Sequence, residues 1–221
     1  MPRSMMTRGH GTSLALALAL VTNAGAGRAA AQELSDRNAR FGGNLALGFA
    51  GELDAHVDDN RTDVDLDASV GFDARVEVPV ADFLVIGGWF EFLSIETDTM
   101  GSEREESFGI DAFVRVRWVF EAVASTLFIE PYVLLPLGFS MAVLPDDDGS
   151  GDDIWPGWNT AVLGGAQVLH ASGFGGYLEM GWRHAEAYQE RTVPILGTNV
   201  DLSLVLNELA LNVGFIYAFG G

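Results

Sequence analysis

The chain has 221 residues, no cysteine and a formal net charge of −19. The absence of cysteine excludes disulfides and thiolate metal sites, and the acidic balance argues against nucleic-acid binding, which needs a basic surface. No apolar run reaches the roughly 18 residues of a membrane-spanning helix, so a membrane protein of this sequence has to cross with strands.

Residues 1–31 have the pattern of a secretory signal peptide. Arg3 and Arg8 make a positively charged start, 14–21 is a short apolar stretch, and the three alanines at 29–31 fit the small-residue cleavage rule. The apolar stretch is too short for a membrane-spanning helix. Cleavage removes three arginines and no acidic residue, so the formal charge of the exported chain falls from −19 to −22.

After a flexible segment at 32–40, the sequence breaks into stretches in which apolar and polar residues alternate. In 64–78, every second residue from Val64 to Val78 is apolar, and none of the residues between them is a large hydrophobe. Successive side chains of a strand point to opposite faces, so this stretch predicts a strand with one apolar and one polar face. The same pattern predicts eight strands, at 41–53, 64–78, 83–95, 108–119, 127–139, 158–169, 174–184 and 200–219.

The connections between these strands alternate between long and short. Stretches at 54–63, 96–106, 142–157 and 185–199 are predicted as long loops, and the first three are rich in acidic residues. Short connections follow the second, fourth and sixth strands. No amphipathic helix separates the strands, which indicates an up-and-down order. Closure of the sheet removes the unpaired edges that lipid does not tolerate. The predicted fold is therefore all-β: an eight-stranded antiparallel up-and-down transmembrane β-barrel over 41–219.

Two places break the alternation. Pro131 and Pro136 lie within the fifth predicted strand, where proline cannot donate a ladder hydrogen bond, so we expect a β-bulge at one of them. In the last strand, 200–206 alternates in the opposite phase to the residues that follow, which predicts a second bulge near Asn207.

Alternation alone does not say which face is outside, because a soluble lipocalin-like carrier also alternates, with its apolar side chains inward. Three features favour the membrane version. The strands reach the roughly 9–11 residues that cross a bilayer with tilt, and aromatic residues such as Trp118, Trp158 and Tyr217 gather near strand ends. The polar face carries charges of both signs with Gly and Ala, which suits a narrow interior.

This pattern over 41–219 resembles the eight-stranded outer-membrane β-barrels, such as the membrane domain of outer membrane protein A. Family members commonly end on an aromatic residue that the barrel assembly machinery reads; here Phe215, Tyr217 and Phe219 match, followed by two glycines. The resemblance implies a bacterial outer-membrane location, contact with membrane lipid and lipopolysaccharide, and insertion by the assembly machinery. We expect a monomer, without the peptidoglycan-binding domain of outer membrane protein A.

The predicted inward face carries a network of charged residues. They are Asp65, Asp67, Asp73, Arg75, Glu77, Glu91, Asp111, Arg115, Arg117, Glu130, Glu179, Arg183 and Glu208. One interpretation is a small cation-preferring pore. The other is a salt-bridged core, which the narrow interior of eight strands favours. The nine acids exceed the four arginines, so some carboxylates have to be hydrated, protonated or bound to a cation.

The third predicted loop offers a weak divalent-cation site. Its acids are Asp146, Asp147, Asp148, Asp152 and Asp153. Calcium and magnesium prefer oxygen ligands, but the spacing is not that of an EF-hand and no bidentate Glu closes the loop, so a merely solvated acidic loop is the simpler interpretation. The hypothesis is that these aspartates hold calcium or magnesium weakly and bridge to lipopolysaccharide phosphates. No other cofactor is expected.

A catalytic role has little support. His170 and Ser172, with Glu179 or Glu186, superficially resemble the His-x-Ser and Glu arrangement of outer-membrane lipid A deacylases. His170 falls in a short turn, however, which this topology places on the periplasmic side, away from lipid A. We therefore expect no enzyme, and instead a structural or surface-interaction protein that acts through its acidic extracellular loops.

Overall fold

The computed structural model describes residues 39–57, 60–97, 105–123, 127–145, 152–193 and 198–219. The predicted signal peptide at 1–31 lies outside these residues, as does most of the predicted flexible segment at 32–40. The first strand begins at Ala39, two residues before the barrel start predicted at Phe41. Within the described residues, no helix is long and apolar enough to cross a membrane.

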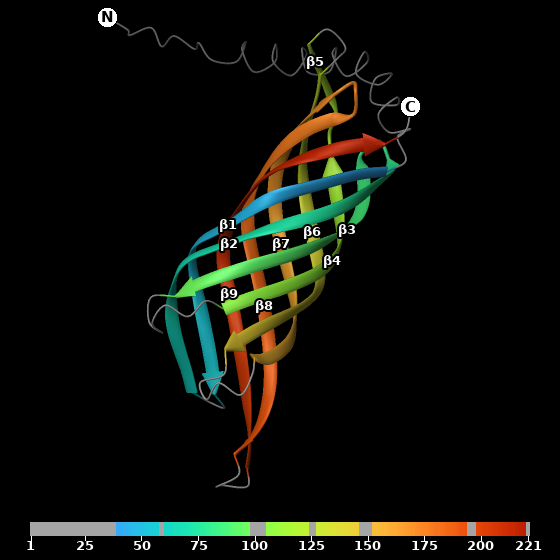
Figure 1. Cartoon of the computed structure of the whole chain (residues 1–221). Coiled ribbons are helices and arrows are strands. Elements are labelled where there is room, and N and C mark those ends of the chain that lie inside the picture. Colours follow the sequence, from blue (N-terminus) through green and yellow to red (C-terminus); the bar gives the residue numbers. More distant parts are fainter. Residues whose placement is uncertain are drawn as a thin grey trace, which may run out of the picture.

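The chain winds into one tilted barrel of antiparallel strands (Figure 1). The strands are β1 (Ala39–Val57), β2 (Asn60–Ala81), β3 (Leu84–Thr97), β4 (Glu105–Arg117), β5 (Phe120–Val123), β6 (Leu127–Pro145), β7 (Asp152–His170), β8 (Phe174–Val193) and β9 (Thr198–Phe219). Eight of them close a ring, because β1 pairs with both β2 and β9, and β4 pairs with β6. This confirms the predicted eight-stranded up-and-down barrel.

The two ends of the barrel differ. We call one the terminal end: Ala39 pairs with Phe219 there, and the turns at 82–83 and 171–173 join neighbouring strands. The other, the distal end, is where the β1–β2, β3–β4, β6–β7 and β8–β9 hairpins finish. β5 is a four-residue extension at the terminal end that pairs with β6 alone after a break at Trp118 and Val119.

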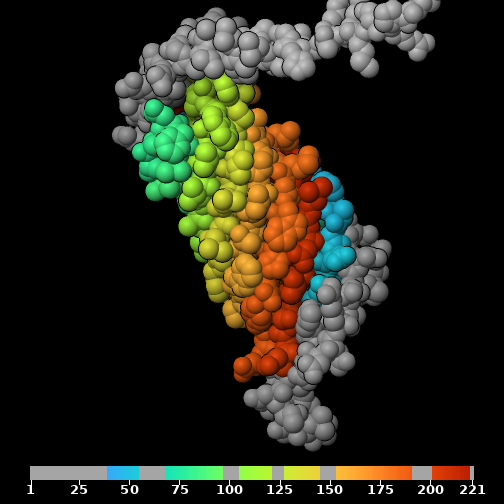
Figure 2. All heavy atoms as spheres, turned by 180° about the vertical axis from the view of Figure 1, so that it is seen from behind, coloured from blue at the N-terminus to red at the C-terminus, as the bar shows by residue number. Residues whose placement is uncertain are grey.

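The barrel is apolar outside and polar inside. Phe72, Ile110 and Leu137 are 53–63% exposed on its outer surface, whereas Arg40 and Glu130 are fully buried in its lumen. Figure 2 shows the outer wall of β6–β9 as a continuous surface. A soluble carrier would have the opposite arrangement, so the lipocalin-like alternative is wrong.

The strands continue well beyond the stretches that alternate. β1 and β2 pair as far as Val57 and Asn60, and β8 and β9 as far as Val193 and Thr198. Much of the four predicted long loops is therefore strand; between β6 and β7, the described residues belong to strands up to Pro145 and again from Asp152. Outside lipid, neither face has to be apolar, so backbone pairing persists where the sequence pattern stops.

The bulge predicted near Asn207 lies on the neighbouring strand instead. The β1–β9 register shifts between Phe49 and Glu52, opposite Asn207, whereas β9 stays in one register with β8. The extra residue falls at Ala50, whose φ of 52° lies in the left-handed region that L-residues rarely adopt. The shift turns Leu53 into the lumen, although the sequence pattern placed it on the outer face with Phe49.

No bulge forms at either proline, which corrects that prediction. The β4–β6 register is continuous through Pro136, and the β6–β7 register is continuous on both sides of it. Pro131 faces the break after β4, where its carbonyl accepts from the backbone N–H of Trp118 at 3.0 Å. Near Pro136, the Thr160 hydroxyl donates to the proline carbonyl at 2.8 Å. The chain thus tolerates both prolines by giving up single ladder bonds.

Candidate functional site

The lumen collects most of the predicted inward charges. Eleven of the thirteen are buried there: Asp73, Arg75, Glu77, Glu91, Asp111, Arg115, Arg117, Glu130, Glu179, Arg183 and Glu208. The side chains of Asp65 and Asp67 lie outside the described residues; Asp67 falls where the β2–β3 register shifts. These charges form two groups at different heights.

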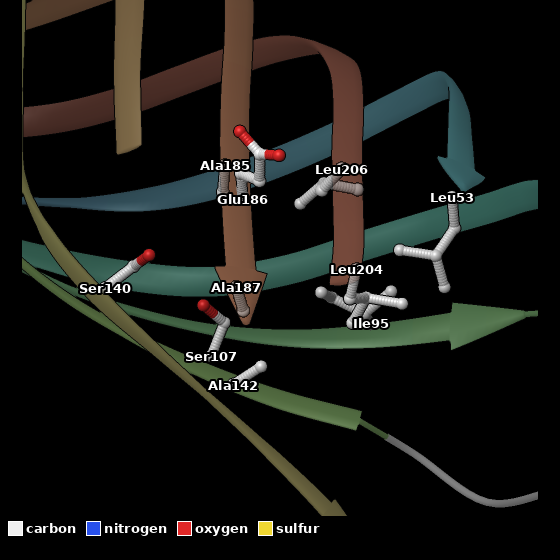
Figure 3. Close-up of a pocket in the computed structure, with 10 residues that line it drawn as sticks. All are labelled: Leu53, Ile95, Ser107, Ser140, Ala142, Ala185, Glu186, Ala187, Leu204 and Leu206. Carbon is white, nitrogen blue, oxygen red and sulfur yellow. The ribbon is translucent and has the colours of Figure 1, made fainter. Parts of the chain in front are cut away.

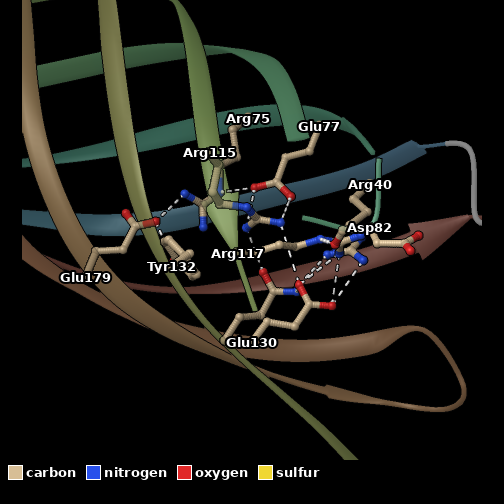
Figure 4. A network of polar contacts seen from close by, with 10 residues as sticks. Arg40, Arg75, Glu77, Asp82, Arg115, Arg117, Glu130, Tyr132 and Glu179 are labelled. Atoms are coloured by element: carbon tan, nitrogen blue, oxygen red, sulfur yellow. Dashed lines mark hydrogen bonds and ion pairs between the residues drawn. The ribbon is translucent and has the colours of Figure 1, made fainter. Parts of the chain in front are cut away.

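The first group, the terminal cluster, lies toward the terminal end. It contains Arg40, Arg75, Glu77, Arg115, Arg117, Glu130 and Glu179 (Figure 4). The carboxylate of Glu130 on β6 forms ion pairs with Arg40 of β1 at 2.8 Å and with Arg117 of β4 at 3.1 Å. Around the ring, β1 and β6 are on opposite sides, so the Arg40–Glu130 pair crosses the centre of the barrel.

The rest of the terminal cluster is equally well paired. Arg115 lies 2.8 Å from Glu77, and Arg75 lies 2.6 Å from Glu179. Glu179 also accepts from the hydroxyl of Tyr132 at 2.6 Å. Two guanidinium groups stack over aromatic rings: Arg75 over Tyr177 at 3.6 Å, and Arg115 over Tyr132 at 4.8 Å. Each carboxylate therefore has at least one arginine, as buried charge requires.

The second group, the distal cluster, has a single arginine. It contains Asp73, Glu91, Asp111, Arg183 and Glu208. Arg183 on β8 contacts Glu208 at 2.8 Å and Glu91, on the opposite side of the ring, at 3.0 Å. The other polar contacts are to neutral groups: Ser69 donates to Glu208 at 2.7 Å, and Asn159 donates to Asp111 at 3.3 Å.

Glycines make room for the distal carboxylates. A Cβ on Gly48 would overlap the Glu208 carboxylate, and a Cβ on Gly138 would overlap that of Asp111. A Cβ on Gly109 would press on the Asn159 amide group. The small residues on the polar face therefore have a specific use, which is to let acidic side chains lie across the strand next to them.

Apolar layers separate and flank the two clusters. Inward residues of β9 show this layering from the terminal to the distal end. Ile216 belongs to an apolar layer near the terminal end, Ala210 to the apolar layer between the clusters, and Leu206 to an apolar layer beyond Glu208 of the distal cluster. The middle layer, between the clusters, contains Trp89, Phe113, Tyr132, Leu134, Ala161, Leu163 and Ala210. The polar-apolar pattern of the sequence did not predict this stacking along the barrel axis.

At the distal end the lumen opens into an apolar pocket (Figure 3). The pocket is small, with a cavity volume of about 20 Å³. The wall is formed mainly by Leu53, Ile95, Ala142, Ala185, Ala187, Leu204 and Leu206, with Ser107, Ser140 and Glu186 beside them. The bulge at Ala50 turns Leu53 inward, and Leu204 and Leu206 come from the stretch of β9 that seemed out of phase.

Sequence reasoning missed Arg40, a central member of the terminal cluster. The residue was assigned to the flexible segment at 32–40, yet it is fully buried and pairs with Glu130. Arg40, Gly42 and Asn44 all share one parity and face inward. Extending the alternation of β1 by one residue pair would have found it.

The predicted cation site is not tested by the structure. Asp146, Asp147 and Asp148 lie outside the described residues. The backbones of Asp152 and Asp153 belong to β7, and Asp153 is half-buried. Across the described ranges, no group of three or more acidic or histidine side chains is arranged to hold a metal ion.

The His170–Ser172 pair forms a local turn contact. His170 Nδ1 lies 2.9 Å from the Ser172 hydroxyl oxygen, and the same nitrogen accepts from the Ser172 backbone N–H at 3.1 Å. The two acids considered as partners are engaged elsewhere. Glu179 binds Arg75 in the lumen, and Glu186 accepts from the indole of Trp158.

No family model matches the sequence, and no curated protein does. The fold does match solved structures. The outer membrane protein OprG from Pseudomonas aeruginosa superposes with a TM-score of 0.59 at 9% identity, covering 83% of this chain and 97% of OprG. This chain has the fold of the eight-stranded outer-membrane β-barrels. Its outer wall is apolar, as the lipid-facing surface of such a barrel has to be.

Two other barrels of this kind are also similar. Neisserial surface protein A has a TM-score of 0.45 at 14% identity, covering 81% of this chain and 97% of its own. The outer membrane protein AlkL, whose structure was determined in lipid bilayers, has a TM-score of 0.46 at 12% identity, covering 83% of this chain and 90% of AlkL.

Proposed function

We propose that this outer-membrane barrel has a structural and surface-interaction role and that no ions pass through its centre. The observation that carries the proposal is the terminal cluster. Its side chains are almost fully buried, and the Arg40–Glu130 pair joins strands on opposite sides of the ring. Eight strands leave an interior only just wide enough for side chains, so such a pair occupies the space that an ion would need.

The distal end faces the cell exterior in this proposal, as in the usual arrangement of short periplasmic turns and longer external connections. The role is non-catalytic and rests on the hairpins that extend beyond the apolar band. Their partners are outer-membrane lipid and lipopolysaccharide, and the barrel assembly machinery inserts the chain as a monomer.

The test is ion flux into proteoliposomes that contain the purified barrel and an entrapped sodium- or potassium-sensitive dye. The proposal predicts flux no faster than that of empty liposomes. A sustained, cation-selective influx that scales with the amount of barrel would favour the small pore instead.

The acidic distal connections are proposed to meet lipopolysaccharide through bound divalent ions. Calcium accepts several oxygens in flexible geometry and can bridge a carboxylate to a phosphate. Calorimetry with calcium, on the wild type and on a variant with five Asp→Asn changes at Asp146, Asp147, Asp148, Asp152 and Asp153, tests this. We expect weak binding, with a dissociation constant on the order of 10⁻⁴–10⁻³ M, that the five changes remove. Unchanged binding would contradict the bridge.

The distal pocket favours a second candidate function, the binding of a small apolar molecule. Pockets for such ligands are concave and lined mainly by hydrophobic side chains, and this one is lined by leucine, isoleucine and alanine with few polar groups. We expect Ala185→Phe to fill the pocket and to weaken binding of a small apolar fluorescent dye. Ala166→Phe, at an outward position on β7, is the matched control. Equal dye binding in all three proteins would exclude this function.

A further inference from the structure

The outer wall of β7 and β8 carries a group of aromatic and polar side chains, one of which, Glu186, also borders the distal pocket. We call this group the outer patch: Trp158, Trp182, His184, Glu186 and Tyr188. Trp158, Trp182 and Tyr188 are among the exposed large side chains of the barrel. None of these residues belongs to either charge cluster.

The members of the outer patch hold one another in place. The His184 ring stacks on Trp182, with centroids 5.5 Å apart and planes 20° apart, and its centroid lies 4.9 Å from that of Trp158. The indole N–H of Trp158 donates to the Glu186 carboxylate at 3.2 Å and lies 3.4 Å from the Tyr188 hydroxyl. The result is an ordered surface of aromatic faces with polar groups between them.

A residue of the next strand fixes the orientation of the imidazole. Nδ1 of His184 lies 2.8 Å from the side-chain carbonyl oxygen of Asn207 on β9. A carbonyl oxygen only accepts, so Nδ1 carries the hydrogen, and the neutral ring keeps Nε2 as an acceptor. Together with Glu186 and the Tyr188 hydroxyl, the patch offers several groups that can bond hydroxyls.

The outer patch begins where β8 leaves the hydrocarbon. Exposed apolar side chains run along the outside of β8 from Phe174 through Leu178 and Met180 to Trp182. A tilted strand crosses the hydrocarbon core in roughly 9–11 residues, a length that ends near His184 when counted from Phe174. The patch is therefore continuous with the lipid-facing wall and lies at headgroup level, where tryptophan and tyrosine concentrate.

The chemistry of the patch selects among headgroups. The patch contains no arginine and carries one carboxylate, so a phosphate has no cation to bind here. A sugar ring offers C–H faces that pack on aromatic rings and hydroxyls that bond carboxylate, phenol and imidazole. We propose that the outer patch binds the sugar headgroup of a glycolipid in the outer leaflet. This inference rests on the proposed orientation, with the distal end outside.

The experiment measures retention of lipopolysaccharide by the refolded, lipid-free barrel in detergent, with native mass spectrometry as the readout. Trp158→Leu combined with Trp182→Leu is expected to weaken retention about tenfold, which corresponds to about 1.4 kcal/mol. Trp118→Leu, which removes an exposed tryptophan next to the terminal end, is the matched control and is expected to change little. Heat-modifiable gel migration shows that each variant has folded.

Two further arms separate sugar recognition from simple anchoring and from phosphate binding. Glu186→Gln and His184→Gln keep the aromatic faces, and each is expected to weaken retention of deacylated core oligosaccharide several-fold. If neither has an effect, or if Trp118→Leu weakens retention as much as the double variant does, the patch is only an interfacial anchor. Equal retention of phosphatidylglycerol and lipopolysaccharide would also overturn the proposal. None of these outcomes depends on whether the lumen conducts, so they are separable from the failure of the proposed function.

Discussion

The two charge clusters in the lumen are built by the same strand alternation, yet they differ in balance. The terminal cluster has four arginines for three glutamates, and each glutamate contacts at least one of them. The distal cluster has one arginine, Arg183, among four carboxyl groups. A buried charge is tolerated only when it is paired and hydrogen-bonded. The comparison indicates that the paired charges of the terminal cluster close the lumen, whereas the distal cluster has more carboxyl groups than its one arginine can pair.

Removing the carboxylate at the centre of the terminal cluster should have the largest effect. Glu130→Gln leaves Arg40 and Arg117 buried without a counterion, and breaking a buried pair in this way costs roughly 3–5 kcal/mol. The measurement is the free energy of unfolding in urea with the barrel in lipid vesicles. Glu52→Gln, on the exposed face of β1, is the control and should change it little. Equal values for both variants would mean that the terminal cluster contributes no net stability.

A smaller loss is expected where glycine makes room for a distal carboxylate. Gly48→Ala places a methyl group against the carboxylate of Glu208 and the hydroxyl of Ser69. Overpacking of this kind costs roughly 1–3 kcal/mol. Gly164→Ala is the matched control, since its Cβ would make only an ordinary contact with the Met180 carbonyl oxygen. If the two variants unfold at the same urea concentration, Gly48 is not needed to accommodate Glu208.

The smallest effect is expected from neutralising an excess acid. Asp111→Asn keeps the size of the side chain, and Asp111 has no arginine within ion-pair distance among the described residues. We expect the free energy of unfolding to change by less than about 1 kcal/mol, or to rise, because one of several crowded carboxylates is removed. A loss as large as that of Glu130→Gln would contradict the contrast between the clusters.

The sequence predicts the part of the fold that lipid controls. Within the apolar band every second residue must be apolar, so the alternation located all eight membrane strands. At the distal end that requirement ends, and the pattern did not reveal that β1–β2 and β8–β9 continue as paired hairpins. The phase reversal at 200–206 signalled a register shift near Asn207, but it did not show that the inserted residue is Ala50 on the neighbouring strand.

The sequence predicted most of the charged residues that face the lumen, but not which of them pair with one another. The alternation placed Glu130 and Arg117 inward, but the pairing of Glu130 with Arg40 joins residues 90 positions apart. Such a contact depends on strand tilt and on which strands face each other across the ring. The apolar pocket was missed for a related reason, because Leu204 and Leu206 on an inward face look like outward residues until the register is known.

The most direct test of the closed lumen is planar-bilayer recording of the wild type beside two variants. One variant combines Arg40→Ala, Arg117→Ala and Glu130→Ala, which empties the terminal cluster; the other is Asp111→Asn in the distal cluster. The account predicts no persistent conductance for the wild type or for Asp111→Asn, and measurable conductance once the terminal cluster is emptied. Large, lasting, cation-selective currents through the wild type would contradict it.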